Sequence, residues 1–311
     1  MLQLRTAGYK ALDILRTEGA VPFSWNSTGE LEERTDKLMQ HFFEERAAVS
    51  KELGAGFLLA EELDRLLRTE EPELMDSENL AATEKLAIVR ALDRQNSVMG
   101  LYSRYAALLL PLVRDIASRT QSRVRLLELA GGTGGLALAL ASEAQKQDLP
   151  LSVTGSDVVP EYIREAKRVA LEKGLPVTFR LLDAFDMNTG QNETFDIILI
   201  SQSLHHFTPG QLAVMIANAE KRNASAFVGI DGHRDLLLGI GMPLAAGLQG
   251  IPAFTLDGLT SARKFYSEPE LRLIAETAVD PGRYAIGCSW PMTVLTVRFD
   301  GGEPAICTRF A

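Results

Sequence analysis

The sequence predicts an α/β fold in which a mostly parallel sheet is covered by helices on both faces and follows a helical region. From about residue 122 onward, short apolar runs alternate with helical stretches, which is typical of a parallel sheet. Only the Trp290-Pro291 region separates the last two apolar runs. These two runs must therefore pair as an antiparallel hairpin.

The individual elements follow from the same patterns. We expect strands at 124–130, 151–157, 177–182, 195–201, 225–231, 283–289 and 292–299, and helices at 134–145, 161–173, 210–222 and 268–278. Residues 1–120 predict helices without strands: one over 36–68 broken at Gly54-Ala-Gly56, one over 79–118 interrupted by Pro111, and a connector at 70–78 between them. We expect 1–120 to form a cap on a main domain at 121–311.

Composition sets the class of protein. The 311 residues are 46% hydrophobic and 23% charged, which is ordinary for a globular chain. With 41 acidic and 32 basic side chains the net charge is −9, which argues against a nucleic-acid partner, because such a partner requires a basic surface. The two cysteines, Cys288 and Cys307, are too few for a disulfide framework and fit a reducing, cytoplasmic location.

One uncharged segment, 236–256, approaches the length of a membrane span. It contains Gly239, Gly241, Pro243 and Pro252, which disfavour a continuous helix. We therefore expect no stable membrane insertion. The segment is expected to be an irregular apolar lid within an insertion at 232–266, packed on the sheet, on the N-terminal helices or on a second subunit, so that a homodimer is an open possibility.

A glycine-rich turn follows the first expected strand. The stretch Glu128-Leu-Ala-Gly-Gly-Thr-Gly134 joins that strand to an Ala/Leu-rich helix. Glycine leaves room for a nucleotide-like ligand to approach the backbone at such a turn. Glycine-rich turns also occur for packing reasons, so the turn alone does not identify the ligand.

Two carboxylates follow the next strands. Asp157 ends the second strand 23 residues after Gly134, where an acidic side chain accepts hydrogen bonds from ribose hydroxyls; the alternative is an N-cap for the helix near Pro160. Asp183, followed by Ala184, ends the third strand, where the pair can recognise an adenine edge. The alternative for Asp183 is a solvated turn residue.

Paired histidines, His205 and His206, follow the fourth strand at the edge where ligands bind. No nearby acid or third histidine completes a metal-ligand spacing, so we expect no metal site. One of them is a candidate proton acceptor, since histidine titrates near neutrality. The alternative is that one caps the next helix and the other packs.

Together these motifs resemble class I S-adenosylmethionine-dependent methyltransferases. Three segments carry the resemblance: the glycine turn at 128–134, the Asp157-Val-Val-Pro-Glu-Tyr-Ile segment, and Phe195-Asp-Ile-Ile-Leu-Ile-Ser-Gln-Ser-Leu-His-His-Phe207. The third segment is most similar to the small-molecule branch that includes ubiquinone/menaquinone-type C-methyltransferases. The resemblance covers roughly residues 122–300.

The resemblance implies a Rossmann-like seven-stranded sheet of order 3-2-1-4-5-7-6 with strand 7 antiparallel. It places Glu128 and Gly132 at the methionine end of S-adenosylmethionine, Asp157 at the ribose, and Asp183 and Ala184 at the adenine. The further cofactor-binding residues that it implies are Ala130, Gly131, Gly134, Val158 and Ser201. Ala130 stands where the family usually has glycine, and the substitution is tolerable if its φ is negative.

Candidate acceptor-binding residues flank this core. Tyr102 and Tyr105 are three positions apart, on one face of an expected helix, and in similar enzymes such a segment closes over the cofactor. Ordinary packing of the two tyrosines is the alternative. Arg263 and Tyr266 border the apolar lid and suggest an apolar or aromatic acceptor with a polar handle.

We therefore expect methyl transfer from S-adenosylmethionine to the oxygen or ring carbon of a small apolar or aromatic metabolite, of the kind found in secondary metabolism. His206 or His233 is the expected base, with His205 a further candidate. Two alternatives remain at this point. One is a non-catalytic protein that binds S-adenosylmethionine, and the other is a nicotinamide-dependent oxidoreductase, which does not explain the terminal hairpin.

Overall fold

The computed structural model describes residues 2–77, 79–187 and 193–304. Its centre is a seven-stranded sheet of order β3-β2-β1-β4-β5-β7-β6. The strands are β1 (Val124–Leu129), β2 (Leu151–Asp157), β3 (Val177–Leu181), β4 (Ile197–Ser201), β5 (Ala226–Gly232), β6 (Tyr284–Ser289) and β7 (Met292–Arg298). Strands β1 to β5 pair in parallel, and β7 runs antiparallel to both β5 and β6. The fold class, the strand order and the terminal hairpin are thus confirmed.

Eleven α-helices and two short 3-10 turns are present in the described part of the chain. They are α1 (Leu2–Thr17), α2 (Thr28–Leu53), α3 (Ala55–Leu67), η1 (Leu74–Asp76), α4 (Ala82–Val98), α5 (Leu101–Thr120), α6 (Gly135–Lys146), α7 (Pro160–Lys173), η2 (Leu204–His206), α8 (Pro209–Lys221), α9 (Leu236–Gly247), α10 (Pro252–Lys264) and α11 (Glu268–Ala278).

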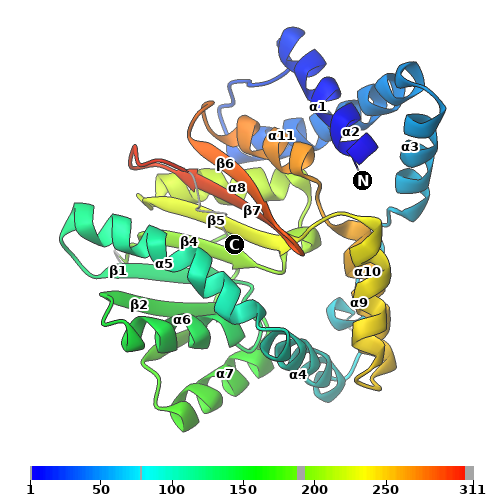
Figure 1. Ribbon diagram of the computed structural model, residues 1–311. Helices are drawn as coiled ribbons and strands as arrows, with labels where there is room; N and C mark the ends of the chain where they lie inside the picture. Colours follow the sequence, from blue (N-terminus) through cyan, green and yellow to red (C-terminus); the bar gives the residue numbers. More distant parts are fainter. Residues whose placement is uncertain (1, 78, 188–192, 305–311) are drawn as a thin grey trace.

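Helices cover both faces of the sheet (Figure 1). On one face, α5, α6 and α7 bury the apolar side chains that β1 and β2 direct toward them. On the other face, α8 and α11 do the same, and α1 and α2 pack outside them (Figure 1). Leu12 and Leu31 of these outer helices lie in the same core cluster as Leu212 and Ile274. The N-terminal helices are therefore part of the core on that face.

The structure confirms the expected helix interruption at Gly54 but not the one at Pro111. Helix α2 ends at Leu53, and Gly54 takes a φ of 107°, as the glycine pair predicts. Pro111, in contrast, lies inside α5, and the break comes earlier, at Gly100. The expected interruption at Pro111 is wrong because Pro111 and Ala107 are both exposed. Water can then bind the carbonyl group that proline leaves without a partner.

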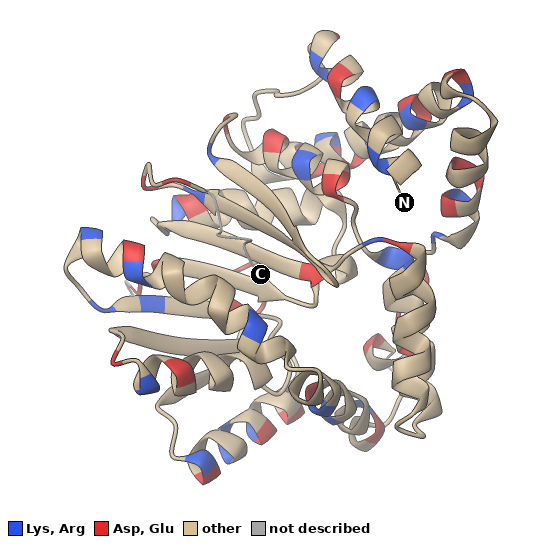
Figure 2. Cartoon of the chain, viewed as in Figure 1, with Lys and Arg blue, Asp and Glu red and all other residues tan. Residues whose placement is uncertain are grey.

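The lid expectation also needs correction. Residues 236–256 form α9 and the start of α10, a helical hairpin rather than an irregular cover. Asp235 caps α9 by accepting from the amide of Leu238 at 2.7 Å, and Gly250, with a φ of 68°, separates the two helices. The segment is also less buried than expected, since Leu237 and Leu244 are 74% and 68% exposed. Helix α9 carries no charge (Figure 2). No described helix is long and apolar enough to cross a membrane.

Candidate active site

A cavity of about 620 Å³ opens at the carboxyl ends of β1, β2, β4 and β5. This is the edge at which parallel α/β sheets bind ligands, because the strand-to-helix turns meet there. The glycine turn and Asp157 form one side of the cavity, and α4 and α5 form a second. The opposite side comes from η1, η2, α9 and Phe265 after α10. Segments far apart in sequence therefore enclose one space.

The glycine turn brings its backbone to this cavity. Gly131 donates its amide to the carbonyl of Ser156 at 2.8 Å, which ties the turn to β2. A Cβ at Gly131 would lie 3.0 Å from Cδ of Glu128, and one at Gly132, whose φ is 56°, would lie 3.2 Å from Val89. Both glycines line the cavity. The turn is therefore a cradle that any side chain would fill.

Two other residues of the turn differ from expectation. Ala130 has a φ of 48°, so the assumption of a negative φ is wrong, and the residue occupies the left-handed region that favours glycine. Gly134 does not line the cavity. A Cβ there would lie 2.3 Å from the ring of Phe179, so Gly134 serves the packing of the turn against β3.

Asp157 joins the glycine turn to the loop before α7. Its Oδ2 accepts from the amide of Gly132 at 2.8 Å and its Oδ1 from the amide of Val159 at 2.9 Å. The side chain is nearly buried, and burial raises its pKa above the ordinary value. Asp157 and Val158 both line the cavity. Since Asp157 ends β2 at the cavity wall, it is placed to accept hydrogen bonds from a diol there.

Glu128 lies beneath the turn and connects three elements. Its Oε1 accepts from the hydroxyl of Ser201 at the end of β4 at 3.0 Å, and its Oε2 accepts from the amide of Ala137 in α6 at 3.1 Å. Complete burial raises its pKa to about 8, despite these two hydrogen bonds. The carboxyl group is therefore largely protonated at neutral pH. Glu128 and Ser201 both line the cavity.

The expected adenine pair lies outside this cavity. Asp183 is exposed and accepts from the amide of Phe185 at 2.8 Å, which is the turn role considered above. Ala184 is buried in the core beside α8. Neither lines the cavity, and a role in adenine binding stays a prediction.

The three histidines have different surroundings. His205 is buried between two carboxylates: its Nδ1 lies 2.8 Å from Oδ2 of Asp231 and its Nε2 lies 3.1 Å from Oε1 of Glu73. Burial by itself would lower its pKa, but the charges of Asp231 and Glu73 raise the pKa to about 10. An imidazole that is protonated at neutral pH cannot accept a proton. The expectation that His205 is a base is wrong for this arrangement.

His206 faces the cavity, and His233 does not. The Nδ1 of His206 lies 2.9 Å from Oδ2 of Asp76. His233 follows β5, where its Nδ1 lies 2.8 Å from Oγ1 of Thr293, and its amide donates to the carbonyl of Pro291. Because His233 lies outside the cavity wall, the structure does not place it where a base is needed.

We expected no metal site because no acid or third histidine lies near His205 and His206 in the sequence, but the fold brings a distant acid to them. Glu73, from the segment expected to be a connector, is 3% exposed and lies against both His205 and His206. Its position depends on the packing of η1 against α10, which no local pattern announces.

The two tyrosines line the cavity, but their hydroxyl groups already have partners. The hydroxyl of Tyr102 donates to Asp93, and the hydroxyl of Tyr105 accepts from Nε2 of Gln202 at 2.6 Å. Asn96 donates to Gln202 at 2.6 Å. The sequence reading missed Asp93, Asn96 and Gln202, all of which line the cavity. Polar residues on the apolar face of α4 are the signal that would have indicated the first two.

The other expected acceptor-binding pair is not at the cavity. Arg263 donates to the carbonyl of Leu67 at 2.8 Å, and the hydroxyl of Tyr266 donates to the carbonyl of Phe207 at 2.6 Å. These bonds hold α10 against α3 and η2. Both expectations are corrected, because the residues that line the cavity from this part of the chain are Ser261 and Phe265 instead.

Comparison with known proteins agrees with the sheet topology. Residues 126–224 match a family model described as a methyltransferase domain. A release factor glutamine methyltransferase of Haemophilus influenzae (strain ATCC 51907 / DSM 11121 / KW20 / Rd) is 34% identical over 110 residues, 31% of this chain. The chain matches only 37% of the length of that relative.

Solved structures of plantazolicin methyltransferases are similar in fold. BamL, in complex with a triazolic desmethylPZN analog and SAH, aligns with a TM-score of 0.51 and 14% identity over 68% of this chain and 90% of that one. BpumL with SAH aligns with a TM-score of 0.52 and 13% identity over 76% and 95%. The ubiquinone/menaquinone-type branch stays a prediction. Residues 126–224 thus match a methyltransferase domain, and the seven-stranded sheet has the Rossmann-like methyltransferase fold.

Proposed function

We propose that this chain transfers the methyl group of S-adenosylmethionine to a small acceptor held in the cavity. The observation that carries the proposal is the continuity of one cavity, which joins the glycine turn and Asp157 to an apolar chamber under α9. In this proposal residues 121–311 form the catalytic domain, residues 1–120 cap it, and the insertion at 232–266 closes the acceptor side.

The residues present fit this cofactor. Gly131 and Gly132 form a cradle that a Cβ would fill, and Asp157 presents a nearly buried carboxylate beside them. Asp157 would bind the ribose, and Glu128 would lie near the methionine end. When bound, S-adenosylmethionine supplies an electrophilic methyl group on a sulfonium centre. The antiparallel β7 argues against the nicotinamide alternative, since that fold ends on a parallel strand.

The acceptor chamber supports an apolar or aromatic acceptor. Leu92, Met99, Leu238, Met242 and Phe265 form its walls. Such walls exclude water and favour a step in which positive charge is lost. The chamber thus contributes alignment of the acceptor, which supplies much of the acceleration when two reactants are held in line.

Binding of S-adenosylhomocysteine tests this proposal, with Gly132→Val as the diagnostic variant and Gly174→Val as its matched control. Both glycines have a positive φ, 56° and 62°, so the backbone strain is similar, but Gly174 ends α7 with no atom within 4 Å of a Cβ. Calorimetry is expected to show that wild type and Gly174→Val bind and that Gly132→Val does not. Equal affinity of the two variants would contradict the proposed site.

A further inference from the structure

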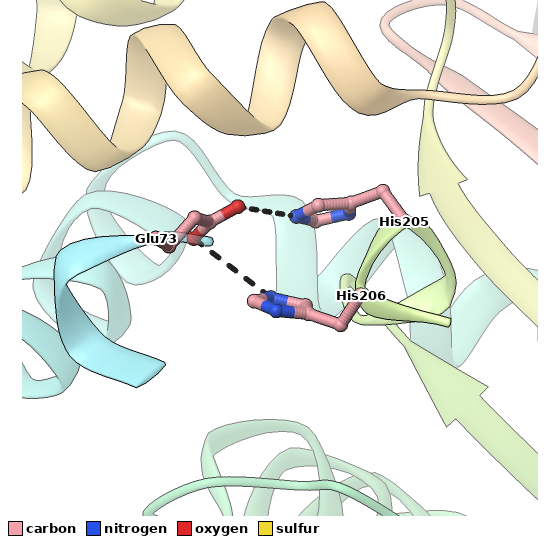
Figure 3. Close-up of side chains that lie close together, drawn as sticks. All are labelled: Glu73, His205 and His206. Atoms are coloured by element: carbon pink, nitrogen blue, oxygen red, sulfur yellow. Dashed lines mark hydrogen bonds and ion pairs between the residues drawn. The ribbon is translucent and has the colours of Figure 1, made fainter. Parts of the chain in front are cut away.

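Three side chains converge at the end of the cavity that faces η1 and η2 (Figure 3). Glu73 directs one carboxylate oxygen to Nε2 of His205 at 3.1 Å and the other to Nε2 of His206 at 3.8 Å. The three ligand atoms lie within 4.8 Å of one another. Two ligand atoms about 2.1 Å from a common metal, at octahedral or tetrahedral angles, are about 3.0–3.4 Å apart. The separation at His205, 3.1 Å, falls in this range, and that at His206, 3.8 Å, is longer by about 0.4 Å.

The outer nitrogen atoms of both imidazoles are held by carboxylates. Nδ1 of His205 lies 2.8 Å from Asp231, and Nδ1 of His206 lies 2.9 Å from Asp76. An ionised carboxylate only accepts, so each Nδ1 is the donor on that side and each Nε2 is the atom that faces Glu73. A metal ion bound there would replace the proton that His205 carries on Nε2. A carboxylate behind each histidine is the usual support of a metal-binding imidazole. This support is present twice.

The simpler explanation is an ion-pair cluster that fastens η1 to the sheet. Three carboxylates, those of Glu73, Asp76 and Asp231, contact the two imidazoles. Even with both imidazoles protonated, these five groups carry an excess negative charge. A divalent cation that replaces the two Nε2 protons leaves the total charge of these groups unchanged, so charge balance does not separate the two explanations. The observation that favours a metal ion is that the three ligand atoms converge at the wall of the cavity, where a bound ion could take a further ligand.

We propose that Glu73, His205 and His206 bind one divalent transition-metal ion. Two histidines and one carboxylate are the ligand set of catalytic zinc sites and of non-haem iron(II) sites, and both leave coordination positions open. All three residues line the cavity, so the open positions face the acceptor chamber. The inference deepens the proposed function, because a metal there would hold an acceptor through an oxygen atom and polarise it.

Binding of Zn²⁺ alone to chelator-treated protein tests the site. Calorimetry is expected to show one Zn²⁺ per wild-type chain, and Glu73→Gln and His206→Ala are each expected to weaken binding by at least about 100-fold. His41→Ala is the matched control, because His41 also lies near a carboxylate, 3.6 Å from Glu45, but on the surface of α2. That variant should bind as wild type does. Asp76→Asn should weaken binding by about 10- to 100-fold, as loss of an outer partner does.

Several results would overturn the metal site. They are no Zn²⁺ binding by wild type, unchanged binding by His206→Ala, or an equal loss in His41→Ala. Glu73 is buried, so Glu73→Gln could lose its fold, which circular dichroism would detect. In that case the result for His206→Ala decides, because His206 is only half-buried. Co²⁺ spectra of the wild-type protein report whether the coordination is tetrahedral. Binding of S-adenosylhomocysteine is measured separately. If the protein binds Zn²⁺ but not S-adenosylhomocysteine, the metal site stands and the proposed function is contradicted. If it binds S-adenosylhomocysteine but not Zn²⁺, only the metal site is contradicted.

Discussion

Glu73 and His205 are 132 positions apart in the chain, yet Oε1 of Glu73 lies 3.1 Å from Nε2 of His205, and both side chains are buried. Glu73 precedes η1, and His205 lies in η2 at the carboxyl end of β4. Oε1 also accepts from the hydroxyl of Ser261 in α10 at 2.7 Å. One carboxylate therefore joins the N-terminal connector, the sheet and the lid at the cavity wall.

Replacement of Asp157 by Ala is expected to weaken binding of S-adenosylhomocysteine by about 1.5–3 kcal/mol, the range for loss of a charged hydrogen-bond partner. The cause is the loss of the carboxylate that holds the amide of Gly132 and faces the cavity. Calorimetry of the folded variant checks the value, and Asp13→Ala, on the surface of α1, is the control. Unchanged affinity in Asp157→Ala would remove Asp157 from the site.

Glu128 is expected to make the stability of the ligand-free protein depend on pH. Its pKa is raised from the ordinary 4.5 to about 8, so between these values the folded protein binds more protons than the unfolded chain. The free energy of unfolding therefore falls as pH rises from about 5 to 8, by at most about 1.4 kcal/mol per pH unit. In Glu128→Gln, which keeps the shape, chemical denaturation should show a flatter profile. The same slope in both proteins would show that Glu128 does not titrate there.

Arg46 holds a buried ion-pair network between α2, α3 and α11. It bonds Glu61 at 2.8 Å and Asp64 at 2.7 Å, and it lies 3.7 Å from Glu270. Arg46→Ala leaves three buried carboxylates with one fewer cation and is expected to lower the free energy of unfolding by about 3–5 kcal/mol.

The control for Arg46 is Arg34→Ala, because Arg34 pairs with Glu30 at 3.3 Å on the exposed face of the same helix. That change should cost less than about 1 kcal/mol. Urea denaturation of both variants provides the comparison. Similar losses in the two would mean that the buried network does not stabilise the fold more than a surface pair does.

Met242 and Leu244 lie on different faces of α9. Met242 lines the cavity, whereas Leu244 is 68% exposed. Met242→Ser is expected to raise KM for the acceptor several-fold and to leave the affinity for S-adenosylhomocysteine unchanged, because α9 lies across the chamber from the glycine turn. Leu244→Ser should change neither. Steady-state kinetics measures KM and calorimetry measures the affinity. The same KM for the acceptor in the two variants would contradict the role of α9 as a wall of the acceptor chamber.

Much of the sheet was predictable from the sequence for a physical reason. Parallel strands that are buried on both faces, such as Ile197–Ser201, form uninterrupted apolar runs, and all seven expected strands agree with the structure within two residues. The strand order followed from the resemblance, not from the runs themselves. The glycine turn and Asp157 were also predictable, since their spacing along the chain fixes their meeting at adjacent strand ends.

What escaped prediction depends on contacts between distant segments. Glu73 lies in a Glu-Glu-Pro-Glu run that reads as a solvated connector, and only packing against α10 buries it. Helix α9 forms despite three glycines and Pro243, because Asp235 caps it and the hairpin packs on α4 through Ala246 and Phe254. The expectation for His205 failed for a similar reason, because the carboxylates of Glu73 and Asp231 that raise its pKa are far from it in sequence.

A ligand bound in this cavity is proposed to donate its methyl group to an acceptor beside it. The most direct test of this transfer is incubation of the wild-type chain with S-adenosylmethionine labelled in the methyl group and a small-metabolite extract, followed by counting labelled product per chain. We expect many turnovers per chain into an apolar or aromatic acceptor, and loss of this activity in Gly132→Val but not in Gly174→Val. Binding of the cofactor with no labelled product above the background of Gly132→Val would contradict methyl transfer and would indicate a non-catalytic binding protein.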